Sequence, residues 1–240
     1  MNSDILLHFH DVVVREYDYD TLADGQWIND TIIDFHAEYL EREYLPKDNS
    51  FLFLRPGMVQ LIRHTPGKRK EEGDSNRGEL IPKTDPTQLG SALPANIDQR
   101  LVIFIPINDG EPQTAYSGSH WSLLVFLRAT ATFYYYDSMQ GANLNEARAT
   151  AMKLLLLLKL SQHPEFIPVP TPQQENGADC GVYVISITDL LVQRMLHYPN
   201  STIEEFVGLK EGDMASPGAV RQDLKTLLLR LTKNNSANHI

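Results

Sequence analysis

The sequence predicts a single α+β domain covering residues 1–240, and three observations support that fold class. Runs of β-branched and aromatic residues, which favour strands, occupy 101–107, 121–127 and 132–137. Alanine, leucine and lysine dominate 144–160, a composition that favours a helix. No internal repeat and no linker-like segment divides the chain, so one domain is the simplest interpretation.

The first part of the chain predicts a helix, a short strand and a second helix. Apolar residues recur at helical spacing within 27–45, where Asn29 or Asp30 is placed to cap the first turn. The apolar run 51–54 is typical of a short buried strand. A proline then opens the segment 56–62, which suits the first position of a helix.

The segment 64–99 differs from the rest of the chain in composition. It is rich in Pro, Gly, Lys, Glu, Asp and Ser and has almost no periodic apolar residues. We expect a long mobile loop here. The three strand-like runs that follow it are expected to form the centre of a sheet.

The second half of the chain predicts mainly helices. A helix over 144–160 is followed by a short strand at 166–169, and a further helix runs over 180–197. Ser216 is placed as the N-cap of the last helix, with Pro217 at its first position.

Composition excludes several classes of partner. The 240 residues carry 21 Lys plus Arg against 31 Asp plus Glu, a net charge of −10. With the longest basic run at 68–70, the chain lacks the clustered cations that nucleic-acid binding needs. The single cysteine excludes an intramolecular disulfide and fits the cytoplasm or the nucleus. No apolar run approaches the ~20 residues of a membrane helix, and we expect no metal site and no membrane partner.

That single cysteine, Cys180, stands where physics favours a reactive thiol. It follows the polar segment 173–179 and opens an apolar helix. The unpaired N–H groups of a helix N-terminus stabilise a thiolate relative to a thiol. Because the thiolate is the nucleophilic form, Cys180 is a candidate nucleophile.

Three further residues complete a candidate catalytic set. His120 comes directly before one predicted strand and Asp137 ends the next, so a hairpin would place both at one end of the sheet. A carboxylate there can hold an imidazole in the tautomer that accepts the thiol proton. Gln174 can donate its amide to an oxyanion beside the backbone N–H of Cys180.

Each of these residues also has an ordinary structural interpretation. A lone cysteine often serves as a small buried hydrophobe, and a histidine at a strand start can simply be solvated. Aspartate at a strand end commonly closes a turn, and an amide beside prolines commonly satisfies loop backbone. The combination is more specific than any one member.

The motifs that surround these residues resemble one family, the cysteine proteases of the ubiquitin-like-protein protease (Ulp) or sentrin-specific protease (SENP) group. They occur in the family order and cover nearly the whole chain apart from 64–99. The matching residues are Trp27-Ile28-Asn29-Asp30, Ser119-His120-Trp121-Ser122, Tyr136-Asp137-Ser138, Gln174 and Asp179-Cys180-Gly181.

The resemblance implies one catalytic domain with a papain-like fold, in which helices flank a central, mostly antiparallel sheet. It implies a catalytic triad of His120, Asp137 and Cys180, with Gln174 as the oxyanion donor. It further implies that Trp27 and Trp121 enclose a narrow channel for the Gly-Gly tail of a ubiquitin-like modifier. Asp30 matches a position at the channel entrance, although a carboxylate in a first helical turn is equally explained by the helix dipole. No cofactor and a monomeric state are the family expectations.

Within the family, Asn108, Asp109 and the segment 117–125 are most similar to the deneddylating member, which favours the neddylation modifier as substrate. Ala178 departs from that pattern, because an aromatic residue occupies its position in some members, the deneddylating one among them. The alternatives are a protease for SUMO or ubiquitin tails, an acyltransferase that uses the same triad, and a non-catalytic module that binds the modifier.

Overall fold

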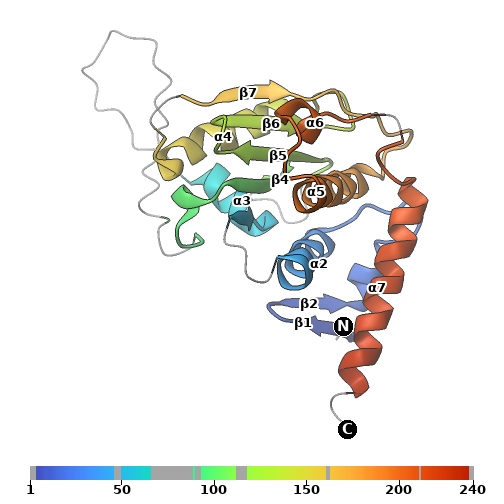
Figure 1. Ribbon diagram of the computed structural model, residues 1–240. Helices are drawn as coiled ribbons and strands as arrows, with labels where there is room; N and C mark the ends of the chain where they lie inside the picture. The colour runs from blue at the N-terminus through green and yellow to red at the C-terminus, as the bar shows by residue number, and fades with distance from the viewer. Residues whose placement is uncertain are drawn as a thin grey trace.

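The computed structural model describes residues 4–45, 50–65, 89, 93–111, 118–160, 163–210 and 212–237. Within these ranges the chain forms a five-stranded sheet, a separate two-stranded sheet and helices on both faces of the larger sheet (Figure 1). The α+β class predicted from the sequence is confirmed. None of the described helices is long and apolar enough to span a membrane.

The larger sheet has the strand order β3-β4-β5-β6-β7. Its members are β3 (Phe51–Phe53), β4 (Val102–Asn108), β5 (Trp121–Leu127), β6 (Thr132–Tyr136) and β7 (Glu165–Pro168). The three central strands pair antiparallel, as the predicted hairpin requires. The two edge strands pair parallel to their neighbours, because each is connected to its neighbour by a long crossover.

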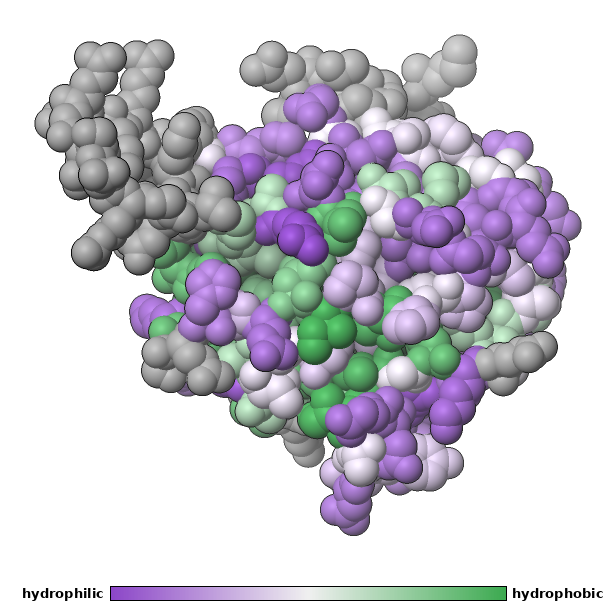
Figure 2. All heavy atoms as spheres, turned by 90° about the horizontal axis from the view of Figure 1, so that it is seen from above, coloured by the Kyte–Doolittle hydropathy of each residue, from purple (hydrophilic) through white to green (hydrophobic). Residues whose placement is uncertain are grey.

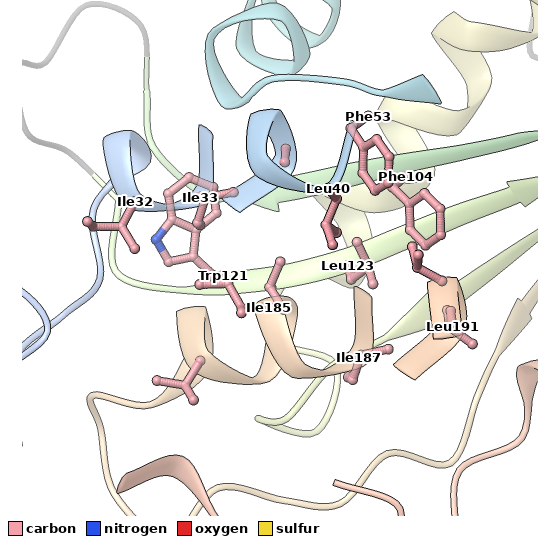
Figure 3. Close-up of a cluster of buried hydrophobic side chains, with 14 of the residues drawn as sticks. Ile32, Ile33, Leu40, Phe53, Phe104, Trp121, Leu123, Ile185, Ile187 and Leu191 are labelled. Atoms are coloured by element: carbon pink, nitrogen blue, oxygen red, sulfur yellow. The ribbon is translucent and has the colours of Figure 1, made fainter. Parts of the chain in front are cut away.

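Two apolar clusters lie on the two faces of this sheet. One face is covered by α3 (Pro56–His64) and α4 (Leu144–Leu158). The other cluster joins the sheet to α2 (Asp30–Tyr39), α5 (Cys180–His197) and α7 (Pro217–Ala237). In Figure 3, Trp121 and Leu123 of β5 lie between α2 residues such as Ile33 and α5 residues such as Ile185. Of the predicted site residues, Trp121 and Cys180 belong to this second cluster.

Most predicted elements are confirmed, with shifted ends. The helix predicted over 27–45 begins at Asp30, because the side chain of Asn29 accepts a hydrogen bond from Ile32 N at 3.2 Å and caps it. Its last turn is a π-helix, η1 (Leu40–Tyr44). The helix predicted to end at Ile62 continues to His64.

The expected loop at 64–99 falls mainly outside the described residues. Of the described part, His64 ends α3 and Ile97–Gln99 form the 3-10 helix η3.

The sequence analysis missed four elements. They are β1 (Ile5–Phe9), β2 (Val12–Arg15), α1 (Glu16–Asp20) and α6 (Ile203–Val207). The first two form a hairpin that packs beside α7, where residues far apart in the sequence lie side by side (Figure 1). Short elements of four or five residues carry too few periodic positions to be recognised.

The strand β7 is an exposed edge of the sheet. Ile167 is 38% exposed and Pro168 ends the strand, which removes a backbone donor from the free edge.

Figure 2 shows the surface of the molecule from above. Apolar residues gather toward the middle of this view, and hydrophilic residues surround them.

Candidate active site

His120 and Asp137 form a buried ion pair at one end of the sheet. His120 directly precedes β5 and Asp137 directly follows β6, and these two strands pair antiparallel. His120 Nε2 lies 2.6 Å from Asp137 Oδ1, and the two side chains are 3% and 4% exposed. The strand pairing predicted from the sequence therefore brings these two residues together.

Asp137 accepts hydrogen bonds from several donors besides His120. The Tyr135 hydroxyl donates to Oδ2 at 2.5 Å, and the backbone amides of Met139 and Asn143 donate at 2.9 and 3.2 Å. Burial opposes ionisation of Asp137, but the hydrogen bonds from His120, Tyr135 and Met139 outweigh it and lower the pKa to about 2. The carboxylate is therefore charged at neutral pH.

The pKa of His120 is shifted in the opposite direction. Burial opposes its protonation, but the hydrogen bond to Asp137 and the interaction with the Cys180 thiol raise the pKa to about 9. Nε2 is engaged by Asp137, whereas Nδ1 has no hydrogen-bond partner among the described residues. Nδ1 is thus the ring nitrogen left to exchange a proton with Cys180.

The turn that leads into His120 is built around Asp109. Its carboxylate accepts hydrogen bonds from Ser119 N at 2.6 Å, Ser119 Oγ at 2.7 Å and His120 N at 3.0 Å. Gly118 has a φ of +115°, and a Cβ there would lie 2.2 Å from Asn108 Oδ1. Only glycine fits this position, which explains the turn-like sequence before the histidine.

Cys180 is the first residue of α5 and is 2% exposed. Its position at a helix N-terminus is as predicted. The next residue, Gly181, lets α5 approach its neighbours closely. A Cβ there would lie 2.9 Å from Ile28 Cβ and 3.5 Å from Trp121 Cδ1.

A cleft of about 330 Å³ contains five of the predicted site residues. Its lining includes Trp27, Asp30, His120, Trp121 and Cys180. Trp27 is 54% exposed, whereas Trp121 is 6% exposed and donates from its indole Nε1 to Ile28 O at 3.0 Å. The two tryptophans therefore belong to one cleft, and one of them is also a core residue.

Two predicted residues, Asp137 and Gln174, are not part of the lining of this cleft. Asp137 is buried beneath His120. Gln174 is hydrogen-bonded to the residue after Asp137, because Ser138 Oγ donates to Gln174 Oε1 at 2.7 Å. Gln174 Nε2 donates to Asn176 O at 2.6 Å, which uses one of the two amide hydrogens and leaves the other for an oxyanion.

Sequence reasoning missed three residues of the site: Tyr135, Asn143 and Arg221. Tyr135 stands two positions before Asp137, and the period of a strand places both on one face, so this signal was present in the sequence. Asn143 is fully buried and donates to His120 O at 3.0 Å from a turn that no local pattern distinguishes. Arg221 belongs to α7 and donates to Asp179, the residue before Cys180. No local signal in the sequence connects Arg221 with Cys180.

Comparison with known proteins supplies the family. Residues 26–216 match the Ulp1 protease family, C-terminal catalytic domain. The chain belongs to this family. It is 36% identical over 200 residues to NEDD8-specific protease 2 of Schizosaccharomyces pombe, covering 81% of this chain and 43% of that protein. It is 30% identical over 201 residues to human sentrin-specific protease 8, covering 83% and 86% of the two chains. The family resemblance inferred from the motifs is confirmed.

The fold of the Ulp1 family is also seen in solved structures. A de-sumoylating protease matches with a TM-score of 0.65 at 16% identity, covering 97% of this chain and 92% of that one. The yeast Ulp1 protease domain, solved in complex with the SUMO ortholog Smt3, matches with a TM-score of 0.58 at 20% identity, covering 96% and 89%. At these identities the likeness concerns the fold. The chain spans less than half of the length of the two fission-yeast relatives, 43% and 44%.

Proposed function

We propose that this protein is a cysteine protease that cleaves after the Gly-Gly tail of a ubiquitin-like modifier. It acts as an isopeptidase and as a C-terminal hydrolase, and its preferred modifier is NEDD8. The observation that carries the proposal is the arrangement of the buried His120–Asp137 pair beside Cys180, in a cleft that also holds Trp27 and Trp121.

The first chemical step is acyl transfer to the thiol. The Cys180 thiolate attacks the carbonyl carbon of the last glycine, and the carbonyl electrons move onto oxygen. The Cys180 N–H and the Gln174 amide stabilise this oxyanion. The imidazolium of His120 protonates the leaving amine as the C–N bond breaks, which leaves a thioester on Cys180.

Water completes the cycle. His120, now neutral, removes a proton from water as the water oxygen attacks the thioester carbonyl. The C–S bond then breaks, which releases the modifier with a free C-terminal carboxylic acid and restores the thiolate and imidazolium of the starting state. Asp137 stays ionised throughout and holds the ring in one orientation. The proposed reaction needs no cofactor.

The walls of the cleft support the choice of a Gly-Gly tail. Trp27 and Trp121 both line this cleft, and indole rings that close on an extended tail would leave no room for a Cβ, so glycine would be admitted where other residues clash. The carboxylate of Asp30 lines the same cleft and suits a basic tail residue at its entrance.

The choice of NEDD8 rests on the relatives. Two fission-yeast relatives are named as NEDD8-specific proteases, at 36% and 32% identity. SUMO and ubiquitin remain the rival modifiers, and a non-catalytic binding module remains the rival class.

The test is reaction of the purified chain with NEDD8, SUMO and ubiquitin, each carrying a C-terminal electrophile in place of the last carboxylate. We expect a mass increase mapped to Cys180 with NEDD8 at a rate well above those for SUMO and ubiquitin. The matched control is Cys180→Ala, which should show no adduct and still bind NEDD8.

Each alternative has its own signature in this experiment. Faster labelling by SUMO or ubiquitin would keep the mechanism and replace the modifier. Absence of labelling by all three, in a protein whose Cys180 still reacts with iodoacetamide, would reject the protease proposal in favour of a binding module. Trapping of a small acyl group on Cys180 from an acyl donor would indicate the acyltransferase.

A further inference from the structure

Arg221 is a charged side chain buried almost completely in the protein. It lies on α7, after the segment that matches the family, and is 2% exposed. Burying a guanidinium costs free energy unless its donors are satisfied by charged or polar partners. The partners of the guanidinium therefore show which segments of the chain Arg221 fixes in place.

Its first set of partners lies directly before the candidate nucleophile. Arg221 Nη2 and Nε lie 2.8 and 3.2 Å from Asp179 Oδ1, and Nη2 also donates to Ala178 O at 3.1 Å. Asp179 is the N-cap residue of α5, so Cys180 is the next residue along the chain. The guanidinium thus fixes the backbone from which the thiol and its own N–H project.

Its second set of partners lies in the segment that leads to Trp27. Arg221 Nη1 donates to Thr21 O and Ala23 O, both at 3.1 Å, and Nη2 donates to Gln26 O at 2.8 Å. Gln26 directly precedes Trp27, a residue of the cleft lining. A single side chain from α7 therefore contacts both the segment before Trp27 and the segment before Cys180.

The charge on Asp179 gives the contact an electrostatic role as well. This carboxylate is 7% exposed and lies one residue before Cys180, where a buried charge without a cationic partner would be costly. Arg221 neutralises it. The other carboxylate oxygen accepts from Asn176 Nδ2 at 2.7 Å, and the Asn176 carbonyl accepts from Gln174 Nε2. The network thus continues to the candidate oxyanion donor.

We propose that Arg221 is a positioning residue for the protease reaction: its guanidinium fixes the Cys180 end of α5 against the segment that carries Trp27 and neutralises Asp179. The inference rests on the proposed function, because it assigns Arg221 to the same site. Arg221 itself touches neither substrate nor the reacting atoms.

The experiment compares Arg221→Met with the unchanged chain on a NEDD8 fusion that releases a fluorescent C-terminal amine. Rates are expressed per competent site, counted by titration with electrophile-tailed NEDD8. Displacement of a reacting group by about 1 Å can cost about 10²-fold in rate, so we expect kcat per competent site to fall by about that factor. KM should rise as well, because the Trp27 segment loses three of its fixed carbonyl contacts.

The matched control is Arg194→Met. Arg194 is also a largely buried arginine, which donates to Phe206 O, Gly208 O and Asp213 Oδ2, but it lies near the far end of α5. Its replacement should lower stability to urea while leaving kcat and KM per competent site unchanged. If Arg221→Met behaves in the same way, Arg221 has a purely structural role and the inference is wrong.

A second pair of variants keeps the inference testable if Arg221→Met does not fold. Arg221→Lys retains the charge but has only three donors on one nitrogen, so it cannot contact both sets of partners at once, and its kcat per site should fall by a smaller factor. Adding Asp179→Asn to Arg221→Met removes the unpaired carboxylate and should restore part of kcat. Equal rates for Arg221→Lys and the unchanged chain would overturn the inference. The proposed function is tested separately, by labelling of the unchanged chain.

Discussion

The two halves of the candidate site are assembled in different ways. The strand half consists of His120 and Asp137 at the ends of β5 and β6, two residues that are 17 positions apart. The helix half consists of Cys180 with the segments 21–28 and 173–179. It is held by contacts of much longer range, such as that of Arg221 with Thr21, 200 positions away.

This difference indicates which substitutions should lower catalytic activity alone and which should also lower the stability of the folded protein. Strand pairing sets the distance between imidazole and carboxylate, so the strand half needs little from the rest of the molecule. The thiol side depends on the close approach of α5 to Ile28 and on the docking of α7. Substitutions in the strand half should therefore remove activity from a folded protein, and those in the helix half should also lower stability.

The largest effect is expected for Asp137→Asn in the strand half. Asp137 accepts from four donors, and an amide presents an NH₂ group to some of them. Because the imidazole loses its fixed tautomer, kcat/KM should fall by about 10³–10⁴-fold. Steady-state kinetics with a NEDD8 fusion measures this fall in kcat/KM. A fall of less than tenfold would show that the carboxylate is dispensable.

A smaller fall in rate is expected for Gln174→Ala in the helix half. Removal of one oxyanion donor typically lowers kcat by about 10²–10³-fold with little change in KM. The neighbouring Glu175 is exposed, so Glu175→Ala is the matched control and should retain full kcat. Equal kcat values in the two variants would remove Gln174 from the oxyanion site.

Gly181→Ala tests the close approach of α5 directly. The added methyl group would lie 2.9 Å from Ile28 Cβ, and overpacking of this kind costs about 1–3 kcal/mol. Urea unfolding should show that loss. Gly177→Ala is the control, because nothing lies within 4 Å of its added Cβ, and it should change the free energy of unfolding by no more than about 0.5 kcal/mol. Equal stabilities would mean that α5 has room to shift.

The pH dependence of stability should report the protonation of His120, whose pKa is raised by Asp137 of the strand half and by Cys180 of the helix half. The pKa of His120 is raised from 6.5 to about 9, so the folded protein holds this proton more tightly than the unfolded chain. The resulting stabilisation is fully present below pH 6.5 and is lost as the pH rises through about 9. The difference in free energy of unfolding between the unchanged chain and His120→Gln should shrink across that range. A difference that stays constant from pH 6.5 to 9.5 would contradict the raised pKa.

The sequence predicted the strand half almost completely, because its determinants are local. Runs of β-branched and aromatic residues located β5 and β6, and their pairing placed His120 and Asp137 at one end of the sheet. Cys180 was located for a similar reason, since a polar segment followed by an apolar helix marks a helix start.

The remaining features of the site depend on contacts that no local pattern encodes. The alternative caps considered for the first long helix were resolved in favour of Asn29 only by its hydrogen bond to Ile32 N. Asn143 lies in a turn and donates a hydrogen bond to the backbone carbonyl of His120. Arg221 lies on a helix whose start was predicted from Ser216 and Pro217, yet its partners come from segments that the chain brings near only on folding.

The hairpin of β1 and β2 also has a consequence for how the chain folds. Asn235 on α7 donates to His8 O at 2.8 Å, and Thr232 Oγ1 donates to Leu6 O at 3.3 Å. These contacts join positions more than two hundred residues apart, and contacts of such separation form slowly because a long loop must close first. During folding, the acid–base pair can therefore be in place before α7 docks, and the surroundings of the thiol are completed last.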